Sequence, residues 1–256
     1  MKKALALVLA AVLICASVFC FASCGEKKEG AVEDNASKTE IKGTLHMATN
    51  AEFEPYEYIK NKKIVGIDPE IAQAICEKLG YELVIDDMKF DSIITAVKSG
   101  KADFGMAGMT VTDERKKSVD FTDSYTNTTQ VIIVKEDSDI ATKKDIKDKH
   151  LGVQLGTTGD GIASDNSSSI ERYNNGADAV LALTQGKIDA VIIDREPAKK
   201  FVEQNEGLKI LDDTFDGEEY AICVKKDSVL TDELNDAIQE LTEDGTIAKI
   251  INKYIK

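Results

Sequence analysis

The chain has 256 residues, of which 43% are apolar and 30% charged, and its 46 acidic residues against 32 basic ones give a net charge of −14. An acidic excess of this size repels phosphate backbones and anionic lipid headgroups, so we expect no nucleic-acid partner and no basic membrane-binding patch. About 215 residues with ordered character exceed what one modest core usually serves, and this length predicts two lobes.

Residues 1–23 predict a signal peptide. A short basic head is followed by an apolar run from Ala4 to Ala22 and by small residues before Cys24. The sequence Phe21-Ala22-Ser23-Cys24-Gly25 resembles the lipobox of bacterial lipoproteins, except that Phe21 stands where Leu is usual. This resemblance implies a lipid on Cys24, with a plain secreted chain and a retained membrane helix as the alternatives.

Residues 24–40 predict a flexible tether, because they are charged and poor in bulky apolar side chains. Removal of residues 1–23 takes away two lysines and no acid, which leaves 30 basic against 46 acidic residues and a net charge of −16. We therefore expect the folded body on the extracytoplasmic face of a cell membrane, held there by the lipid alone.

From residue 41 onward, strand-like and helical patterns alternate, which predicts an α/β fold with a largely parallel sheet. Asp68-Pro69-Glu70 predicts the capped start of a helix, and Gly80 predicts its end. Further strands are predicted at 45–49, 83–86, 102–109, 131–135, 151–155, 190–193 and 220–224, with helices at 92–98 and, as a pair separated near Gly245, at 231–253.

The cysteine and histidine content argues against a metal site. Only Cys76 and Cys223 remain to the folded body if Cys24 is acylated and the signal peptide is removed. Each lies in an apolar pattern, so we expect two buried small side chains and no disulfide or metal pair. His46 and His150 alone cannot assemble a metal centre or a catalytic triad, and we expect no cofactor.

The stretch GKADFGMAGMTVTDER, residues 100–115, predicts an anion-binding corner. A buried strand ends in small residues, and a helix then begins near Thr110 and Thr112 with Arg115 in its first turn. Unpaired N–H groups at a helix start attract negative charge, and the arginine fork suits a carboxylate. The alternative is an ordinary helix with Thr112 as its N-cap and Arg115 in solvent.

An internal echo supports two lobes. DSIITAVKSGKAD, residues 91–103, has a counterpart in ADAVLALTQGKID, residues 177–189, at a fixed offset of 86. Each segment predicts an amphipathic helix, a glycine stop and a buried strand, and the same offset relates Gly108 to Asp194. Two unrelated helix–strand units with common Gly-Lys turns are the alternative.

Five segments carry a resemblance that spans nearly all of residues 41–256: ATNAEFEPYEY (48–58), VGIDPEIAQAI (65–75), FDSIITAVKSGKADFGMAGMTVTDERKKSVDFT (90–122), GVQLGTT (152–158) and GKIDAVIID (186–194). In this order they resemble the amino-acid-binding branch of the extracellular, or periplasmic, solute-binding proteins of ABC importers. The resemblance implies the type II periplasmic-binding-protein fold, with a ligand cleft between two lobes. It places the crossing strands near 129–132 and 221–225, with 41–131 and 225–256 in lobe 1 and 132–224 in lobe 2.

The same resemblance implies how the α-groups of an amino acid are held. Arg115 would pair with the α-carboxylate, assisted by the N–H groups of Thr110 and, from the other lobe, Thr158. Asp194 would bind the α-ammonium group, with the carbonyl of Gly108 and the hydroxyl of Thr110 as further acceptors. Lobe closure would bring the two halves of this site together.

For the ligand side chain, the resemblance points to Asn50, Phe53, Phe90 and Gln154, together with Tyr56. Asn50 stands where relatives that bind basic amino acids often have Asp, although Glu52 or Glu57 could restore a carboxylate. Phe53 could equally be core and Glu57 solvated. A polar L-amino acid is expected, with glutamine-like and basic ligands both open.

The function implied is that of a lipoprotein that captures a polar L-amino acid and delivers it to ABC transporter permease subunits, without catalysis and as a monomer. Two other classes use this fold. Cyclohexadienyl dehydratases need a general acid and a site for a second carboxylate, and no cation near Asn50 or Gln154 offers that site. A ligand-sensing receptor module is the other, and no membrane helix or kinase-like extension follows Lys256.

Overall fold

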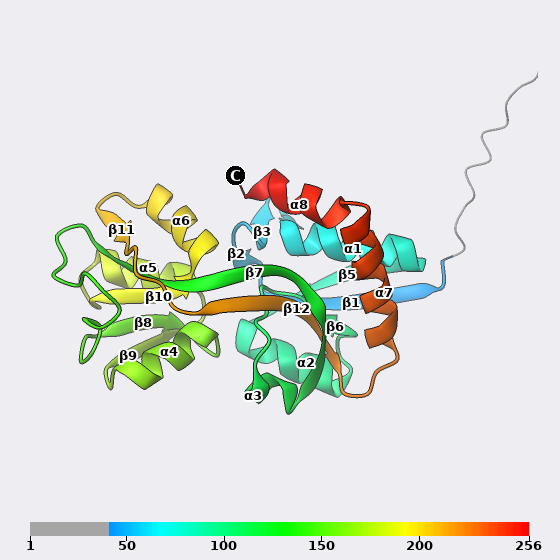
Figure 1. Cartoon of the computed structure of the whole chain (residues 1–256), viewed down its shortest axis with the longest axis horizontal. Helices are drawn as coiled ribbons and strands as arrows, with labels where there is room; N and C mark the ends of the chain where they lie inside the picture. The colour runs from blue at the N-terminus through cyan, green and yellow to red at the C-terminus, as the bar shows by residue number, and fades with distance from the viewer. Residues whose placement is uncertain (1–40, 256) are drawn as a thin grey trace, which may run out of the picture. The chain divides into compact units, whose positions relative to one another are not determined.

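A computed structural model describes residues 41–255 of the chain (Figure 1). Its strands form a nine-stranded sheet and a separate three-stranded sheet, and helices lie on both sides of the large sheet. The signal peptide, the lipid on Cys24 and the tether predicted for residues 1–40 lie outside the described residues. Within residues 41–255, no helix combines the length and the apolar character that crossing a membrane requires.

The first lobe is built around β1, which is parallel to both β5 and β6. A small antiparallel sheet, β2–β4, stands beside it. The elements of this lobe are β1 (Gly43–Thr49), β2 (Glu52–Phe53), β3 (Glu57–Lys60), β4 (Lys63–Val65), α1 (Ile67–Leu79), β5 (Tyr81–Asp87), the 3-10 helix η1 (Phe90–Ser92), α2 (Ile93–Ser99), β6 (Phe104–Gly105), α3 (Asp113–Lys116), α7 (Leu230–Glu243) and α8 (Thr246–Tyr254).

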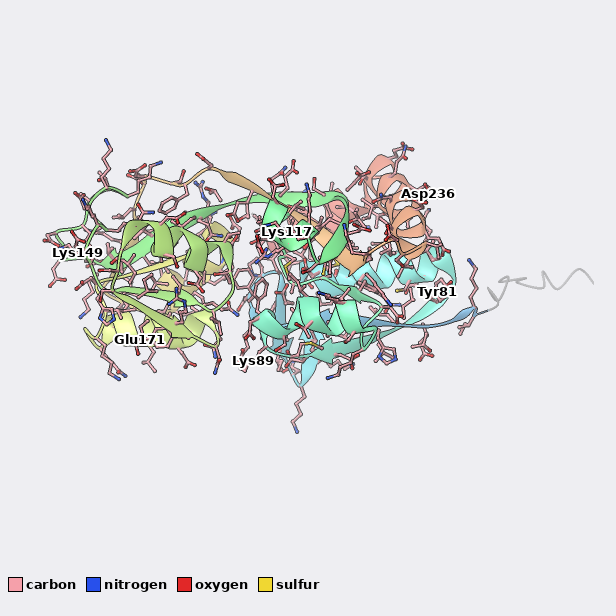
Figure 2. All side chains as sticks on the ribbon, turned by 90° about the horizontal axis from the view of Figure 1, so that it is seen from below. Tyr81, Lys89, Lys117, Lys149, Glu171 and Asp236 are labelled. Carbon is pink, nitrogen blue, oxygen red and sulfur yellow. The ribbon has the colours of Figure 1, made fainter. Side chains whose placement is uncertain are left out.

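The second lobe has β8 at its centre, parallel to β9 and β10. Figure 2 shows Lys149 and Glu171 on this lobe, and Tyr81 and Asp236 on the first. The elements of the second lobe are β8 (Leu151–Gln154), α4 (Thr158–Asn166), β9 (Ile170–Tyr173), α5 (Gly176–Thr184), β10 (Ala190–Asp194), α6 (Arg195–Gln204) and β11 (Leu208–Ile210).

Two long strands, β7 (Val119–Lys135) and β12 (Gly217–Lys225), connect the lobes. They pair with each other in antiparallel fashion, and β7 then continues beside β10 and β11, again antiparallel. The nine-stranded sheet is therefore mixed, so the prediction of a largely parallel sheet was wrong for its centre. The reason is that a strand shared by two lobes must run against the returning strand that carries the chain back.

The strand pairings of β12 bear on where the second crossing lies. Cys223 and Val224 pair with Gly105 and Phe104 of β6, which puts the end of β12 inside the first lobe. On β7, Thr129 still pairs with Gly217, whereas Gln130 faces Asp194 of the second lobe. We propose that the second crossing falls at 217–220 and that the lobe boundary lies there.

The predicted strand at 102–109 shrinks to Phe104–Gly105, because the chain leaves the sheet immediately afterward. Gly108 adopts a φ of 52°, a conformation that favours glycine. This turn carries Thr110 to an isolated bridge with Tyr220 on β12. The predicted strand at 131–135 was too short, since it is only the end of the 17-residue β7.

Asp68 does not cap α1 as predicted. Gly66 holds the N-cap position, and the Asp68 side chain is fully buried inside the first turn. Its carboxylate accepts hydrogen bonds from the Gly108 N–H at 2.8 Å and from the Tyr125 hydroxyl at 2.9 Å. Burial raises the pKa of Asp68 to about 6 even though these two donors oppose the shift. The residue predicted to start a helix thus fixes the backbone at Gly108.

The hydrophobic core follows the crossing strands. One cluster of buried apolar side chains extends from Met47 of β1 to Val191 of β10, and each lobe has a further cluster, beneath α2 and beneath α4 respectively. Cys76 and Cys223 are buried and unpaired, which confirms the prediction for both. Burial raises the pKa of Cys76 to about 11 and that of Cys223 to about 12, so both thiols stay protonated at neutral pH.

The internal echo is a structural repeat. Gly100 and Gly186 both adopt a left-handed conformation after α2 and α5, with φ of 74° and 70°. Each unit also makes two hydrogen bonds to an earlier segment of the chain. In the first lobe, the Asp103 N–H donates to the His46 carbonyl, and the Asp103 carboxylate accepts from the His46 N–H. In the second lobe, Asp189 and His150 form the same two bonds. The two units therefore share the same turn conformation and the same hydrogen-bond pattern.

Gly105 offers a test of the packing between β6, β12 and α2. A Cβ atom there would lie 2.6 Å from both Cys223 Sγ and Ile93 Cγ2, which are buried and cannot move freely. We expect Gly105→Ala to lower the free energy of unfolding by about 1–3 kcal/mol in urea titration, because overpacking strains the core. Gly161→Ala is the control, since its added methyl group meets open space on α4. Equal stability of the two variants would contradict this account of the packing.

Candidate functional site

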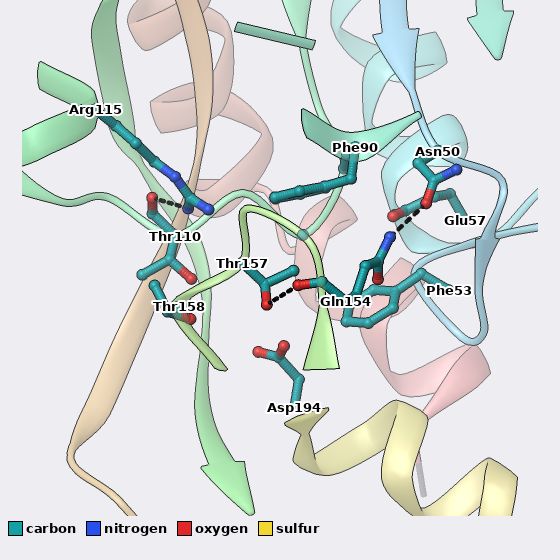
Figure 3. A pocket seen from close by; sticks show the side chains of 12 residues that line it. Asn50, Phe53, Glu57, Phe90, Thr110, Arg115, Gln154, Thr157, Thr158 and Asp194 are labelled. Carbon is teal, nitrogen blue, oxygen red and sulfur yellow. Dashed lines mark hydrogen bonds between the residues drawn. The ribbon is translucent and has the colours of Figure 1, made fainter. Parts of the chain in front are cut away.

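A cavity lies between the two lobes, beside the crossing strands (Figure 3). The side chains and backbone that line it come from both lobes: Asn50, Phe53, Glu57, Phe90, Ala107, Gly108, Thr110, Arg115, Gln154, Thr157, Thr158 and Asp194. All nine residues predicted for the ligand site are among them.

Arg115 forms one end of the cavity. Its guanidinium group donates to the Thr110 carbonyl at 2.7 Å and, across the lobes, to the Gly156 carbonyl at 3.0 Å. It also lies over the Phe90 ring, 5.3 Å from the centroid. Among residues 41–255, no carboxylate forms an ion pair with it, and burial lowers its pKa from the ordinary value. The positive charge is therefore available to an anion in the cavity.

The predicted helix start at Thr112 exists and is short. Thr112 is the N-cap of α3, and its hydroxyl accepts from the Arg115 N–H at 3.2 Å. The ordinary-helix alternative is thus correct for Thr112, while Arg115 reaches back from that helix into the cavity. A four-residue helix contributes little dipole, so the side chain and not the helix supplies the positive charge here.

Two backbone N–H groups face the cavity without an acceptor in the described part of the chain, those of Thr110 and Thr158. Thr158 is the first residue of α4, and the preceding Thr157 caps this helix through Asp160. Gly156 makes the turn that precedes it, with φ of 78°. Since α4 spans nine residues, its N-terminus also favours negative charge.

Asp194 ends β10 and is 5% exposed. Burial raises the pKa of Asp194 to about 6, while hydrogen bonding from the Tyr220 hydroxyl opposes this shift. No lysine, arginine or histidine of residues 41–255 forms an ion pair with it. A buried carboxylate without a counter-charge favours a cationic group beside it, because pairing offsets part of the desolvation cost.

Gly108 brings the backbone close to two aromatic side chains, and it lines the same cavity as Asp194. A Cβ atom there would lie 3.1 Å from Phe53 Cε1 and 3.1 Å from Tyr220 Cε2. Its N–H donates to Asp68, which holds the peptide between Ala107 and Gly108 in one orientation. Glycine is required at this position by both the positive φ and the close approach.

Phe53 and Phe90 stand between the two ends of the cavity (Figure 3). Phe53 stacks on Tyr56 at a centroid distance of 6.0 Å, and Tyr56 in turn meets the edge of Tyr220 at 5.0 Å. Tyr56 is 1% exposed and does not line the cavity, so the sequence reasoning that grouped it with the pocket side chains was wrong. It supports Phe53 from behind.

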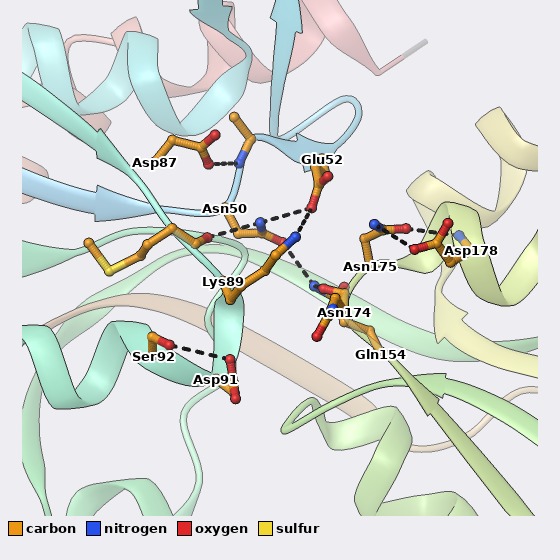
Figure 4. A network of polar contacts seen from close by, with 12 residues as sticks. Asn50, Glu52, Asp87, Lys89, Asp91, Ser92, Gln154, Asn174, Asn175 and Asp178 are labelled. Carbon is orange, nitrogen blue, oxygen red and sulfur yellow. Dashed lines mark hydrogen bonds and ion pairs between the residues drawn. The ribbon is translucent and has the colours of Figure 1, made fainter.

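The end opposite Arg115 is polar. Gln154 Nε2 donates to Asn50 Oδ1 at 2.8 Å, which joins the lobes a second time (Figure 4). Asn50 Nδ2 donates to the Met88 carbonyl at 3.0 Å and to Glu52 at 3.2 Å. Lys89 approaches the same Glu52 carboxylate, so Glu52 lies at the rim and pairs with surface groups.

Glu57 supplies a buried carboxyl group at this polar end, and it was only an alternative in the sequence reasoning. It is 1% exposed, lines the cavity, and its Oε2 atom has no hydrogen-bond partner among residues 41–255. Burial raises the pKa of Glu57 well above its ordinary value, and the nearby Asp68 carboxylate raises it further. The prediction that Glu57 could be merely solvated was therefore wrong.

Sequence reasoning also missed Glu218, which lies behind the cavity on β12. Its carboxylate accepts from the hydroxyls of Thr110 and Thr158. Nothing in the local sequence distinguishes Glu218, because it is one of 46 acidic residues in the chain and lies near the start of a strand. Among the described residues, no cluster of His, Cys, Asp or Glu could hold a metal ion.

Comparison with known proteins gives one consistent family. Residues 45–256 match the bacterial extracellular solute-binding proteins, family 3. The chain is 37% identical to the arginine-binding extracellular protein ArtP of Bacillus subtilis (strain 168), over 99% of this chain and 98% of that protein. It is 34% identical to a probable histidine-binding protein of Campylobacter jejuni, over 87% of this chain and 89% of that protein.

Solved structures agree. An ancestral arginine-binding protein bound to arginine superposes with a TM-score of 0.80 and 41% identity, over 85% of this chain and 100% of that chain. An ancestral arginine-binding protein bound to glutamine gives a TM-score of 0.80 and 40% identity, over 84% of this chain and 99% of that chain. Since sequence and fold match over nearly the whole described body, the chain belongs to the bacterial extracellular solute-binding proteins of family 3.

Proposed function

We propose that the chain is the extracytoplasmic substrate-binding component of an amino-acid ABC transporter, and that the cavity binds one L-amino acid. The observation that carries this proposal is the presence of two buried, uncompensated charges in the same cavity, Arg115 and Asp194. A zwitterionic α-amino acid brings an anion and a cation that match them. Binding would convert two costly buried charges into two paired ones.

The α-carboxylate would lie between the Arg115 guanidinium and the free N–H groups of Thr110 and Thr158. The α-ammonium group would lie against Asp194, with the Gly108 carbonyl and the Thr110 hydroxyl as its other acceptors. Thr158 and Asp194 belong to the second lobe, and Arg115, Thr110 and Gly108 belong to the first. Each α-group would thus be held from both lobes, so that ligand favours closure.

For the ligand side chain, we propose a basic amino acid and arginine first. Phe53 and Phe90 would hold its aliphatic stem, and Asn50, Gln154 and Glu57 would face its polar end. Glu57 Oε2 is a buried acceptor that lacks a donor, and a guanidinium group supplies several donors together with a positive charge. The relatives named for arginine and histidine support the same choice, whereas a glutamine side chain would leave the Glu57 carboxylate without a counter-charge.

A binding role fits the cavity better than catalysis. The raised pKa of Glu57 is a property that a general acid needs, so a dehydratase-like activity was considered. A substrate with two carboxylates requires a second cation, and Arg115 is the one cationic side chain among the twelve lining residues of the described chain. The relatives are also named as binding proteins. We infer that the protein delivers its ligand unchanged to permease subunits.

We further propose that the mature chain is a monomer anchored to the cell membrane through a lipid on Cys24. Support comes from the lipobox-like sequence before Gly25 and from the charged residues 24–40, which give the reach a tethered body needs. The family is extracellular, which agrees with this placement. With its net charge of −16 after removal of residues 1–23, the body itself would not adhere to anionic lipids.

The α-group assignment predicts a selective loss of affinity. Arg115→Ala and Asp194→Asn are expected to lower the affinity for L-arginine by about 2–5 kcal/mol. Asp194→Asn removes a buried charge that has no counter-charge, so the ligand-free unfolding free energy of this variant should equal or exceed that of wild type. Titration calorimetry and urea unfolding measure the two quantities. Agmatine, which lacks the α-carboxylate, serves as the control ligand. It should bind wild type far more weakly than L-arginine does, and Arg115→Ala should add little to that loss. An additive loss would remove Arg115 from the site.

The role of Glu57 predicts a pH dependence that separates basic from neutral ligands. Since its folded pKa is raised, Glu57 must lose a proton before it can pair with a cation, so L-arginine affinity should increase as pH rises above the ordinary titration range of a glutamate. Asp194, with a pKa of about 6, affects arginine and glutamine alike. Calorimetry should therefore detect proton release with arginine in excess of that with glutamine. Glu57→Gln should abolish the excess and shift preference toward glutamine; an unchanged preference would refute the basic assignment.

The anchor predicts a change of location upon a single substitution. Cys24→Ala is expected to leave the body folded and either to release it from the membrane fraction or to leave the signal peptide uncleaved, because no thiol remains to be acylated. Fractionation and intact mass measure both outcomes. Cys20→Ala, inside the signal peptide, is the matched control and should stay anchored. Membrane retention of a correctly cleaved Cys24→Ala chain would exclude the lipoprotein assignment.

A further inference from the structure

Glu218 makes an unusual set of contacts at the crossing of the lobes. One atom, Oε2, accepts hydrogen bonds from Thr110 Oγ1 at 2.9 Å, from Thr158 Oγ1 at 2.9 Å and from Gln130 Nε2 at 3.2 Å. Thr110 belongs to the first lobe, Thr158 begins α4 in the second, and Gln130 lies on β7 between them. Three elements thus meet on one carboxylate oxygen immediately behind the cavity.

These contacts decide the polarity of the two threonine hydroxyls. A hydroxyl group has one proton and two lone pairs, and it can turn to act as donor or acceptor. The hydroxyl protons of Thr110 and Thr158 are both donated to Glu218, so only the lone pairs of these hydroxyls remain for a ligand. Thr110, which is 5% exposed, therefore offers the cavity a hydroxyl acceptor and a backbone N–H donor.

Without the Glu218 carboxylate, the hydroxyl proton of Thr110 would be free to turn toward Asp194 or toward the ligand. A proton pointing into the cavity would oppose an ammonium group and favour a neutral or anionic one. The orientation of the Thr110 hydroxyl therefore determines which of these two ligand classes is favoured. Glu218, which sets this orientation, does not itself line the cavity.

We propose that Glu218 is a positioning residue that selects for the α-ammonium group of the ligand, because it holds the hydroxyl protons of Thr110 and Thr158 away from the cavity. This inference rests on the proposed function of the cavity as an amino-acid site. Glu218 acts through Thr110 and requires no direct contact with the ligand. Its negative charge adds to that of Asp194 on the same side, which is also seen in its contribution to the raised pKa of Asp194.

Two other roles for Glu218 give different outcomes. A clasp that merely joins the lobes through Thr110 and Thr158 would, when removed, weaken every ligand to the same degree. If Glu218 instead competed with the α-carboxylate of the ligand for hydrogen-bond donors, its removal would strengthen binding. The positioning role weakens only ligands that carry the ammonium group.

The test compares L-arginine with 5-guanidinopentanoic acid, which lacks only the α-amino group. Dissociation constants are measured by calorimetry for wild type, Glu218→Met, Thr110→Val and the double variant, with folding checked by thermal unfolding. Methionine is similar in length to glutamate and has no oxygen to accept the two hydroxyl protons, so Glu218→Met should weaken L-arginine by about 10- to 100-fold and should change 5-guanidinopentanoic acid by less than about threefold. Glu219→Met, at an exposed neighbour on β12, is the matched control and should change neither.

The double-mutant cycle of Glu218 and Thr110 provides a second test, which uses L-arginine alone. If Glu218 acts through the Thr110 hydroxyl, its substitution should cost L-arginine little further affinity once Thr110→Val has been made. Fully additive losses, equal losses for both ligands, or a gain in affinity would each overturn the positioning role. Failure of wild type to bind any of the twenty L-amino acids would instead refute the proposed function, and with it this inference.

Discussion

The site depends on two charges buried without partners. Arg115 donates only to backbone carbonyls, and Asp194 accepts from a tyrosine hydroxyl, so neither charge is neutralised by the described chain. Burial disfavours both charged forms, which is seen in the lowered pKa of the first and the raised pKa of the second. Such an arrangement costs stability unless a ligand completes it. Gly108 and Thr157 line the same cavity, and the turn at Gly156 leads into the helix that Thr157 caps.

The crossing strands make this arrangement possible. Because β7 and β12 pass through both lobes, the residues along them are fixed relative to each other while the lobes contribute separate walls. Hydrogen bonds from Arg115 to Gly156 and from Gln154 to Asn50 span the cavity at its two ends. The buried network of Asp68, Tyr125 and Gly108 stays within the first lobe.

The structural repeat explains why opposite polarities meet in the cavity. In each lobe a helix, a left-handed glycine and a short buried strand are joined to an earlier segment by two hydrogen bonds between a histidine backbone and an aspartate, one to the aspartate side chain and one from its N–H. The strand of the first unit leads to Gly108, whose carbonyl is an acceptor, and that of the second ends at Asp194, which carries a charge. One backbone design used twice thus delivers two acceptors from opposite sides. This pairing is what the α-ammonium group of an amino acid requires.

The sequence by itself predicted the fold class, the paired helix–strand units and nine of the twelve residues that line the cavity, because short-range periodicity and a long, ordered resemblance carry that information. It failed where distant segments compete for the same residues. The length of β7, the buried carboxylate of Asp68, the supporting place of Tyr56 and the unpartnered oxygen of Glu57 all depend on which surfaces meet. Glu218 is the clearest case, since three segments far apart in the chain give that one acid its partners. Charge and burial are properties of the assembled lobes, so only the tertiary structure could decide them.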